Sequence, residues 1–438
     1  MFKTLQNALK MKELRGRLIF TFLMLLVIRF GSQLPVPGVD PDYFADFFNG
    51  SNGDAFNLFN AMTGGSFENF SILALSISPY ITSSIIIQLL TIAIPKLEEL
   101  QQDGQEGRKK IAEITRYVTV GLALIHSTAM SIGFGRSGMF EHYTWYNVVV
   151  CVITLTAGSA FLMWVGERIT EKGVGNGISV VLLYNIISRL PDDAITIYET
   201  FMSGRSIAVQ ILIAVFVIAI LLAILGFTVL LNAAERRIPV QYAKRVVGRK
   251  MYGGQSTNIP IKVAAGGVMP IIFASSIMAF PATIVRLVSG GNMPTAGLGY
   301  YILGCLSAGY ASAWWTSLVY AILYALLILF FTYFYSSIQF NPIELANNMK
   351  KSGGYIPGIR PGKPTSDYIG KISSRLNLVG AFFLAIIAIL PVIVGAIFNV
   401  TALQIGGTSL LIMEGVALET VRQIESQMTM RHYKGFLE

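Results

Sequence analysis

The sequence contains little charge for its length. Of 438 residues, only 13% are Asp, Glu, Lys or Arg, whereas 53% are hydrophobic. Soluble domains carry about 25% charged residues, so this chain has too little polar surface to cover a water-soluble globule. Disordered chains are poor in the apolar residues that abound here. The composition therefore excludes a soluble enzyme and a disordered protein, and it indicates an integral membrane protein with several spans.

Metal ligands and nucleotide-binding motifs are also scarce. Cys151 and Cys305 have no CxxC spacing and the three histidines are scattered, so zinc, redox and disulfide chemistry have no support. The string at 358–364, GIRPGKP, has the wrong spacing for a P-loop and a proline where magnesium binding requires Ser or Thr. No GxSxG motif occurs. We predict that the chain is not an enzyme and has no cofactor.

Long apolar runs are what the sequence has in abundance. A membrane helix needs about 20 mostly apolar residues. We predict ten spans, at 18–34, 71–94, 115–135, 146–166, 176–190, 207–231, 262–288, 313–338, 376–398 and 405–421. With the N-terminus inside and alternating spans, 28 of the 33 Lys and Arg lie on the inner side, counting span ends with the nearer side. This asymmetry predicts cytoplasmic N- and C-termini.

The span interiors are almost free of charge. Ion-coupled carriers place acids, His or Arg inside the bundle to bind ions or relay protons. Here the main exceptions are Arg29 and Glu414. Glu414 could face a wet cavity, pair with a partner chain or act as a proton site. The scarcity of such charges argues against an ion-coupled small-solute transporter, which stays open as the alternative function.

Three further sequence features indicate a role beyond simple anchoring in the membrane. The Lys- and Arg-free outer segment 35–76 contains an apolar, Gly-rich stretch at 56–67 that is too short to span; it is either a re-entrant segment or an ordinary surface loop. The loops at 233–261 and 341–373 mix basic residues with Pro, Tyr and Gly. Either they only fix topology, or they dock a large acidic partner or RNA.

Finally, the second and seventh spans both place a Ser pair shortly after a proline, at Pro79 and Pro270, which hints at an internal repeat.

Several strings, in order along the chain, carry a family resemblance. They are LPVPGV at 34–39, SPYI at 78–81, GVGNGIS at 173–179, RIPVQYA at 237–243, FASS at 273–276, PGIRPG at 357–362 and GGTSLLI at 406–412. On these residues the chain resembles, end to end, SecY, the central subunit of bacterial protein-translocation channels. The resemblance implies an all-α, polytopic membrane protein whose ten helices form two inverted-repeat halves of five around an hourglass pore.

The resemblance also divides the chain into parts. These are a cytoplasmic N-terminal segment (1–17), a first half (18–190) with an outer plug region (56–70), an outer hinge loop (191–206), a second half (207–421) with cytoplasmic loops (233–261 and 341–373), and a cytoplasmic tail (422–438).

Functional positions follow from the resemblance alone. The pore ring is expected at Ile81, Ile85, Leu182, Ile272, Ser276 and Ile412. The plug is expected at Met62, Thr63, Gly64, Gly65, Ser66, Phe67, Glu68, Asn69 and Phe70. A lateral gate between the second and third spans and the seventh and eighth is expected to include Thr82, Gln88 and Ser275. Docking of a motor or ribosome is expected at Arg236, Arg237, Tyr242, Lys244, Arg245 and Arg360.

The implied function is passage of unfolded preproteins bearing a signal sequence across the bacterial plasma membrane. Apolar segments would leave sideways into lipid because they gain by transfer to hydrocarbon. The implied partners are the SecE and SecG subunits, the SecA motor, the ribosome and membrane lipids. Physically, a ring of branched apolar side chains blocks ions without a charged gate. Glu414 departs from the expected apolar residue, and its place two residues after Ile412 turns it roughly 200° around the helix, away from the pore.

Overall fold

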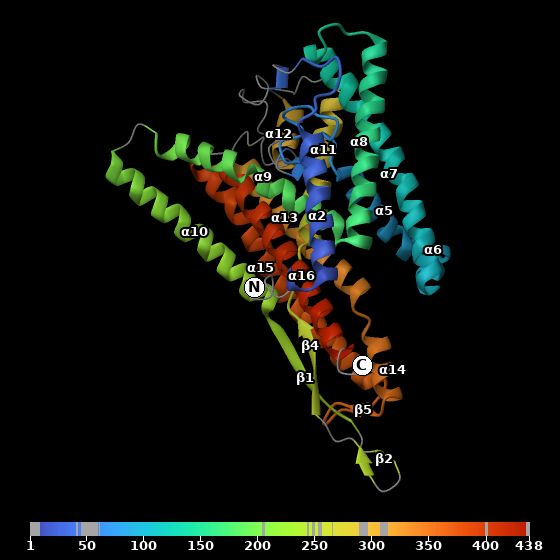
Figure 1. The fold of residues 1–438 in the computed structure, drawn as a ribbon. Helices are drawn as coiled ribbons and strands as arrows, with labels where there is room; N and C mark the ends of the chain where they lie inside the picture. Colours follow the sequence, from blue (N-terminus) through green and yellow to red (C-terminus); the bar gives the residue numbers. More distant parts are fainter. Residues whose placement is uncertain are drawn as a thin grey trace.

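The computed structural model describes residues 9–40, 43–44, 60, 62–203, 206–242, 245–247, 250–252, 256–264, 266–288, 297–306, 314–398 and 402–434. In this part of the chain, ten long helices coincide with the ten predicted spans (Figure 1). They are α2 (Lys12–Ser32), α5 (Ser78–Ala93), α7 (Gly104–Phe134), α8 (Trp145–Lys172), α9 (Gly177–Phe201), α10 (Ile207–Ala233), α11 (Met269–Val288), α13 (Trp314–Gln339), α15 (Lys363–Phe398) and α16 (Ala402–Lys434).

Shorter elements connect these helices. The helical ones are α6 (Pro95–Gln102), the π-helical turn η2 (Gly135–Met139), α12 (Leu298–Leu306) and α14 (Pro342–Lys351). The strands are β1 (Glu235–Tyr242), β2 (Arg245–Val247), β3 (Lys250–Tyr252), β4 (Ser256–Lys262) and β5 (Gly354–Tyr355).

Length and composition alone identify fewer spans than the fold contains. In the described residues, five helices are long and apolar enough to cross a membrane, and a sixth if α5 and α6 count as one bent span. Other helices carry charge within the bundle, such as Arg29 in α2 and Glu414 in α16. Both side chains have polar partners on other segments, and such pairing is what makes intramembrane charge tolerable.

Several helix ends differ from the predicted spans. α11 begins at Met269 rather than 262, which is the last residue of β4, whereas α7 and α15 begin earlier and α16 ends later than predicted. The ends of α5 and α9 have local causes. α5 begins at Ser78 rather than 71, because 71–77 form tight turns that end at Ser76 with φ of 48°. It ends at Ala93 because Ile94 precedes Pro95, and a residue before proline avoids the helical region; Ile94 is extended and α6 departs at 106°. α9 continues through Pro191 to Phe201, so most of the segment expected as an outer hinge loop is helical.

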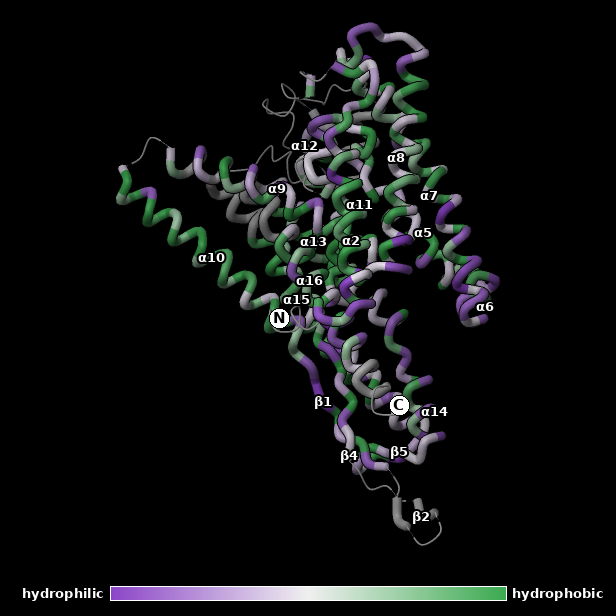
Figure 2. The backbone as a smooth tube through the Cα atoms, viewed as in Figure 1, coloured by the Kyte–Doolittle hydropathy of each residue, from purple (hydrophilic) through white to green (hydrophobic). Residues whose placement is uncertain are grey.

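The helices pack as two groups that meet along two lines. α2 to α9 contact one another, as do α10 to α16. Between the groups, α9 contacts α16 on one side, and α11 contacts α5 and α7 on the other. α10 leans away from the bundle and is hydrophobic along its whole length (Figures 1 and 2). It buries only Thr228 and Leu231, as suits a helix that faces lipid.

The two basic loops fold together outside the bundle. β1 pairs with β4 over seven registered positions and with β5 at Gln241↔Tyr355, so the sheet order is β4-β1-β5. One apolar cluster underlies it, formed by Ile238, Val240, Ile261, Met349, Ile356 and Ile369. The β1–β4 hairpin projects from the end of the bundle where α2 begins and α16 ends (Figure 1). The sheet and α14 therefore pack together as one unit that joins the two loops.

Candidate channel constriction

Two isoleucines of α5 occupy one face of that helix. Ile81 and Ile85 are four residues apart, which places them one above the other. They are 6% and 4% exposed. The helix can present them inward because Pro79 sits in its first turn, where a proline costs no hydrogen bond. α5 thus contributes two branched apolar side chains to the interior at the line where the two helix groups meet.

Three other helices contribute to the same apolar cluster. Leu182 of α9, Ile272 of α11 and Ile412 of α16 are 3%, 2% and 1% exposed, and all belong to the contiguous cluster that contains Ile81 and Ile85. The sixth predicted ring residue, Ser276, is half-buried and its hydroxyl donates to the carbonyl of Ile272 at 2.8 Å. The structure therefore brings side chains from both halves together. We call the five apolar ones, Ile81, Ile85, Leu182, Ile272 and Ile412, the collar.

The low exposure of the collar residues shows that they do not line a water-filled passage in this structure. Side chains that line a water-filled passage remain accessible to solvent, whereas these are almost completely enclosed by other side chains. Branched apolar groups at this density leave no room or hydrogen-bonding partner for water. Such an arrangement can exclude ions. Because the five side chains have no polar groups that need hydrogen-bond partners, they would not select against any particular side chain of a passing polypeptide.

The apolar residues of the predicted plug segment are divided between two clusters. Met62 lies in the same cluster as the collar. Phe67 and Phe70 lie in a second cluster, where they contact Phe44 and Phe134 with ring centroids 4.5–6.4 Å apart. Of the other predicted plug residues, Thr63, Gly64 and Ser66 are buried, Gly65 and Glu68 are half-buried, and Asn69 is exposed. Part of the wider plug region, 56–59 and residue 61, lies outside the described residues.

The predicted lateral gate residues lie on the helices that meet at the α5–α11 line. Thr82 and Gln88 are half-buried on α5, and Ser275 is buried on α11. In the described part of the chain, their side-chain donors bond within their own helices, to the Ser78 carbonyl, the Ser84 hydroxyl and the Ile272 carbonyl. Because these bonds do not join the two helices, separating α5 from α11 would leave them intact.

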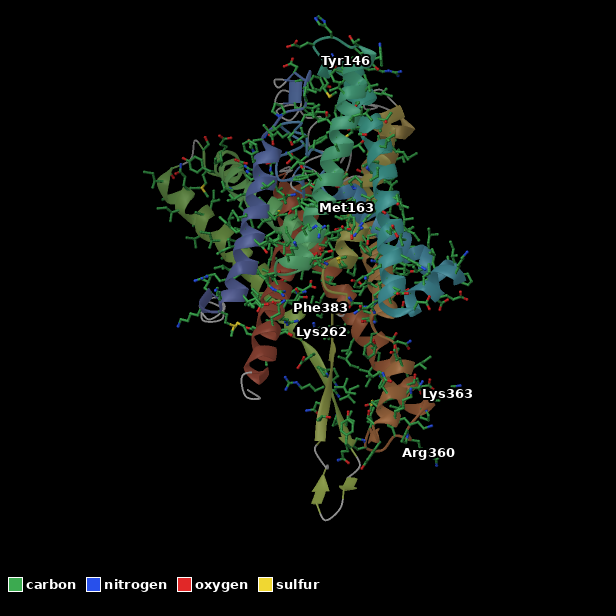
Figure 3. All side chains as sticks on the ribbon, turned by 45° about the vertical axis from the view of Figure 1, so that its right-hand side comes forward. Tyr146, Met163, Lys262, Arg360, Lys363 and Phe383 are labelled. Atoms are coloured by element: carbon green, nitrogen blue, oxygen red, sulfur yellow. The ribbon has the colours of Figure 1, made fainter. Side chains whose placement is uncertain are left out.

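The predicted docking residues belong to the sheet unit. Arg236 and Arg237 are exposed on β1, and Arg360 is exposed in the turn before α15 (Figure 3). Tyr242 is half-buried at the end of β1 and packs on Gly354, where a Cβ atom would lie 2.9 Å from its ring. Arg245 begins β2, but its side chain and all of Lys244 lie outside the described residues.

Some polar residues that contact the plug segment are not among the residues that the sequence predicts for the site. Asn185 and Arg189 of α9 bond to Met62 and Glu68 across more than 120 positions of sequence. Arg29 was recognised only as an unusual intramembrane charge. The one available signal was that Leu182, Asn185 and Arg189 share a helix face.

Glu414 faces α10 rather than the collar. Its carboxylate accepts a bond from Asn232 Nδ2 at 3.2 Å, and Arg422 donates to the Asn232 carbonyl at 3.3 Å. Its second oxygen is buried without a hydrogen-bond partner in the described part of the chain. Ile412, two residues earlier, lies in the apolar cluster, so the two side chains point in different directions around α16.

Comparisons with known proteins identify the family of this chain. A family model described as SecY matches residues 71–421. The chain is 45% identical over 444 residues to the protein translocase subunit SecY of Halalkalibacterium halodurans, covering 100% of both, and 40% identical to that of Thermotoga maritima, covering 100% of this chain and 98% of that one.

Solved structures share the fold. One described as "The structure of a protein conducting channel" aligns with a TM-score of 0.64 at 17% identity, covering 94% of this chain and 92% of that one. Sec61 in a canine ribosome-channel complex from the endoplasmic reticulum aligns with a TM-score of 0.61 at 16% identity, covering 94% and 92%. These likenesses concern the ten-helix architecture.

Proposed function

Because this chain belongs to the SecY family of protein translocase subunits, we propose that it forms the protein-conducting channel of a bacterial translocon. It is a multi-pass membrane protein that acts as a conduit and not as an enzyme. Its substrates are unfolded preproteins with a signal sequence, which cross the plasma membrane through the collar. The ion-coupled transporter finds no support in the family match.

The observation that carries the proposal is the collar itself. Five nearly enclosed apolar side chains come from α5 and α9 of one half and α11 and α16 of the other, which are the helices at both meeting lines. Separation of the halves would therefore widen the collar directly. A polar substrate segment could then continue outward, while an apolar segment gains free energy by leaving between α5 and α11 into lipid.

The exterior features support a driving partner on one side. The exposed Arg236 and Arg237 lie on β1, and the exposed Arg360 lies in the turn between β5 and α15. The sheet unit projects from the bundle, which supports a docking surface for acidic protein or RNA phosphate. We assign this side to the cytoplasm, with both termini, and expect SecA or the ribosome to dock there. A structural relative was solved in a ribosome-channel complex. The apolar, exposed α10 leaves surface for a small membrane subunit such as SecE or SecG.

The test is transport of a signal-bearing preprotein into vesicles that contain this chain, SecE and SecA. The proposal predicts that the preprotein becomes protected from added protease only when ATP is present. Absence of ATP-dependent protection, with a vesicle preparation of a known translocase active in parallel, would contradict it. A preprotein without its signal sequence is the matched substrate control.

A further inference from the structure

Three polar side chains bind the plug segment, residues 62–70, at its beginning, middle and end. Asn185 Nδ2 of α9 donates to the Met62 carbonyl at 3.0 Å. Arg29 Nη1 of α2 donates to the Gly64 carbonyl at 3.1 Å. Arg189 Nη1 of α9 pairs with Glu68 Oε2 at 2.5 Å. The segment is therefore held by directional bonds in addition to apolar packing.

One face of α9 carries both the collar and the plug contacts. Leu182, Asn185 and Arg189 are spaced by three and four residues, so they lie above one another on the same side of the helix. Leu182 is a collar residue, Asn185 bonds the near end of the plug segment and Arg189 bonds its far part. A displacement of α9 that widens the collar must stretch both bonds, because the three side chains share one rigid backbone.

The connector after the plug segment is strained and is tied to the same helix. Phe70 and Ser76 have φ of 37° and 48°, a region that residues with side chains rarely adopt. Asn185 Nδ2 also lies 3.3 Å from the Ser76 hydroxyl, and Ser159 donates to the Ser76 carbonyl at 3.3 Å. Loss of the Asn185 bonds would free the Met62 carbonyl at the start of the plug segment and the Ser76 hydroxyl at the end of the connector, while the Ser159 bond to the Ser76 carbonyl would remain.

The burial of the bonded side chains affects how much free energy is lost when the bonds break. The side chain of Arg189 is 18% exposed and that of Glu68 is 40% exposed, and Glu68 also accepts a bond from Asn60 at 2.9 Å. Asn185 is 5% exposed. A buried donor that loses its partner without gaining water is unfavourable. The bonds of the buried Asn185 are therefore costly to break, whereas the Arg189–Glu68 pair contributes less because solvent already reaches Glu68.

We propose that Asn185 and Arg189 of α9, with Arg29 of α2, form a latch that holds the plug segment over the collar and couples its release to the movement of α9. The latch rests on the proposed channel function, since it regulates the same passage. It differs from a purely structural anchor because it predicts a change in sealing without a loss of transport.

The test measures ion conductance of the complete complex, this chain with its small subunits, in planar lipid bilayers. R189Q and E68Q each remove one side of the ion pair, and N185L removes the amide. We expect each to raise the conducting fraction of an idle channel roughly tenfold, as the loss of a charge-assisted or buried hydrogen bond implies. R108Q is the matched control, since Arg108 is exposed near the start of α7, at the opposite end of that helix from Phe134, which contacts the plug segment. It should behave like the wild type.

The double variant R189Q/E68Q tests whether the two residues act as a pair. The latch predicts that it leaks no more than the leakier single variant. A double effect equal to the product of the single effects contradicts the pair. R189K keeps the charge and should leak less than R189Q; equal leakage of the two overturns the electrostatic role of Arg189.

Transport measurements separate failure of the latch from failure of the channel. All latch variants should retain ATP-dependent preprotein transport, which also shows that they fold. If wild-type complexes transport protein, and glycine at Ile81 and Ile85 causes a leak while R189Q, E68Q and N185L stay sealed, the latch is wrong and the channel stands. If neither transport nor a leak through collar variants occurs, the channel proposal itself fails.

Discussion

Ile85 of α5 and Ile272 of α11 come from opposite halves of the chain and are buried in one contiguous apolar cluster, 4% and 2% exposed. The helices that carry them contact each other at one of the two lines where the halves meet. In the proposed channel, burial of these two side chains contributes both to the seal of the passage and to the closure of the seam. Opening the seam and widening the collar become parts of one movement.

Replacing Ile81, Ile85 and Ile272 by glycine should open a leak for ions. Removal of the branched side chains leaves a cavity that water can enter, and a wetted constriction conducts. Conductance of the reconstituted complex measures the effect. Ile153→Gly is the matched control, because Ile153 is 63% exposed on α8 and faces away from the cluster. If the triple collar variant conducts ions no better than the control variant, the collar side chains do not form the seal.

Reversing Arg360 to glutamate should impair motor-driven transport by about tenfold or more while the chain still folds. Arg360 is exposed in the turn before α15, so its side chain supports docking rather than packing, and a reversed charge repels an acidic partner. ATP-dependent transport and binding of SecA to vesicles are the measurements. Lys110→Glu on α7, a distant exposed cation, is the control. Normal SecA binding by the R360E variant argues against docking at this turn.

Deleting residues 62–70 should leave a channel that transports protein but seals poorly. The segment contributes Met62 to the cluster that contains the collar, and Phe67 and Phe70 to a second cluster, yet the collar side chains belong to α5, α9, α11 and α16. Idle conductance should rise while transport continues. If transport is lost although the deleted chain is stable in detergent, the segment is an integral part of the fold rather than a removable plug.

Replacing Glu414 by valine should be tolerated, with transport within about twofold of the wild type. The carboxylate faces Asn232 of α10 and not the collar, and one of its oxygens is buried without a partner, so its removal costs little. Thermal unfolding of the purified complex should be unchanged or shifted upward. A loss of transport by E414V with normal stability would show that Glu414 acts as a proton or partner site.

The sequence predicts the helices well and their contacts poorly. Apolar runs of about 20 residues leave little choice in a membrane, so each predicted span corresponds to a helix in the described part of the chain. The resemblance placed the collar positions, whose burial in one cluster the structure then displays. Their role as a pore ring remains a prediction.

Long-range pairings had no local signal. Asn185 reaches Met62 across 123 positions, and Arg189 reaches Glu68 across 121, so nothing near either residue indicates the other. The pairing of β1 with β5, which joins the two basic loops, likewise depends on how the bundle places their ends. The continuation of α9 through Pro191 could not be read from the sequence either, because proline ordinarily predicts a helix end.

Site-specific photo-crosslinking of a preprotein arrested in transit tests the central claim most directly. A photoreactive residue at Ile85 or Ile272 should crosslink to the arrested chain in an ATP-dependent manner. The same residue at the outward-facing Ile153 should not. Equal labelling from all three positions, or none from Ile85 and Ile272 while transport proceeds, would show that the polypeptide does not pass through the collar.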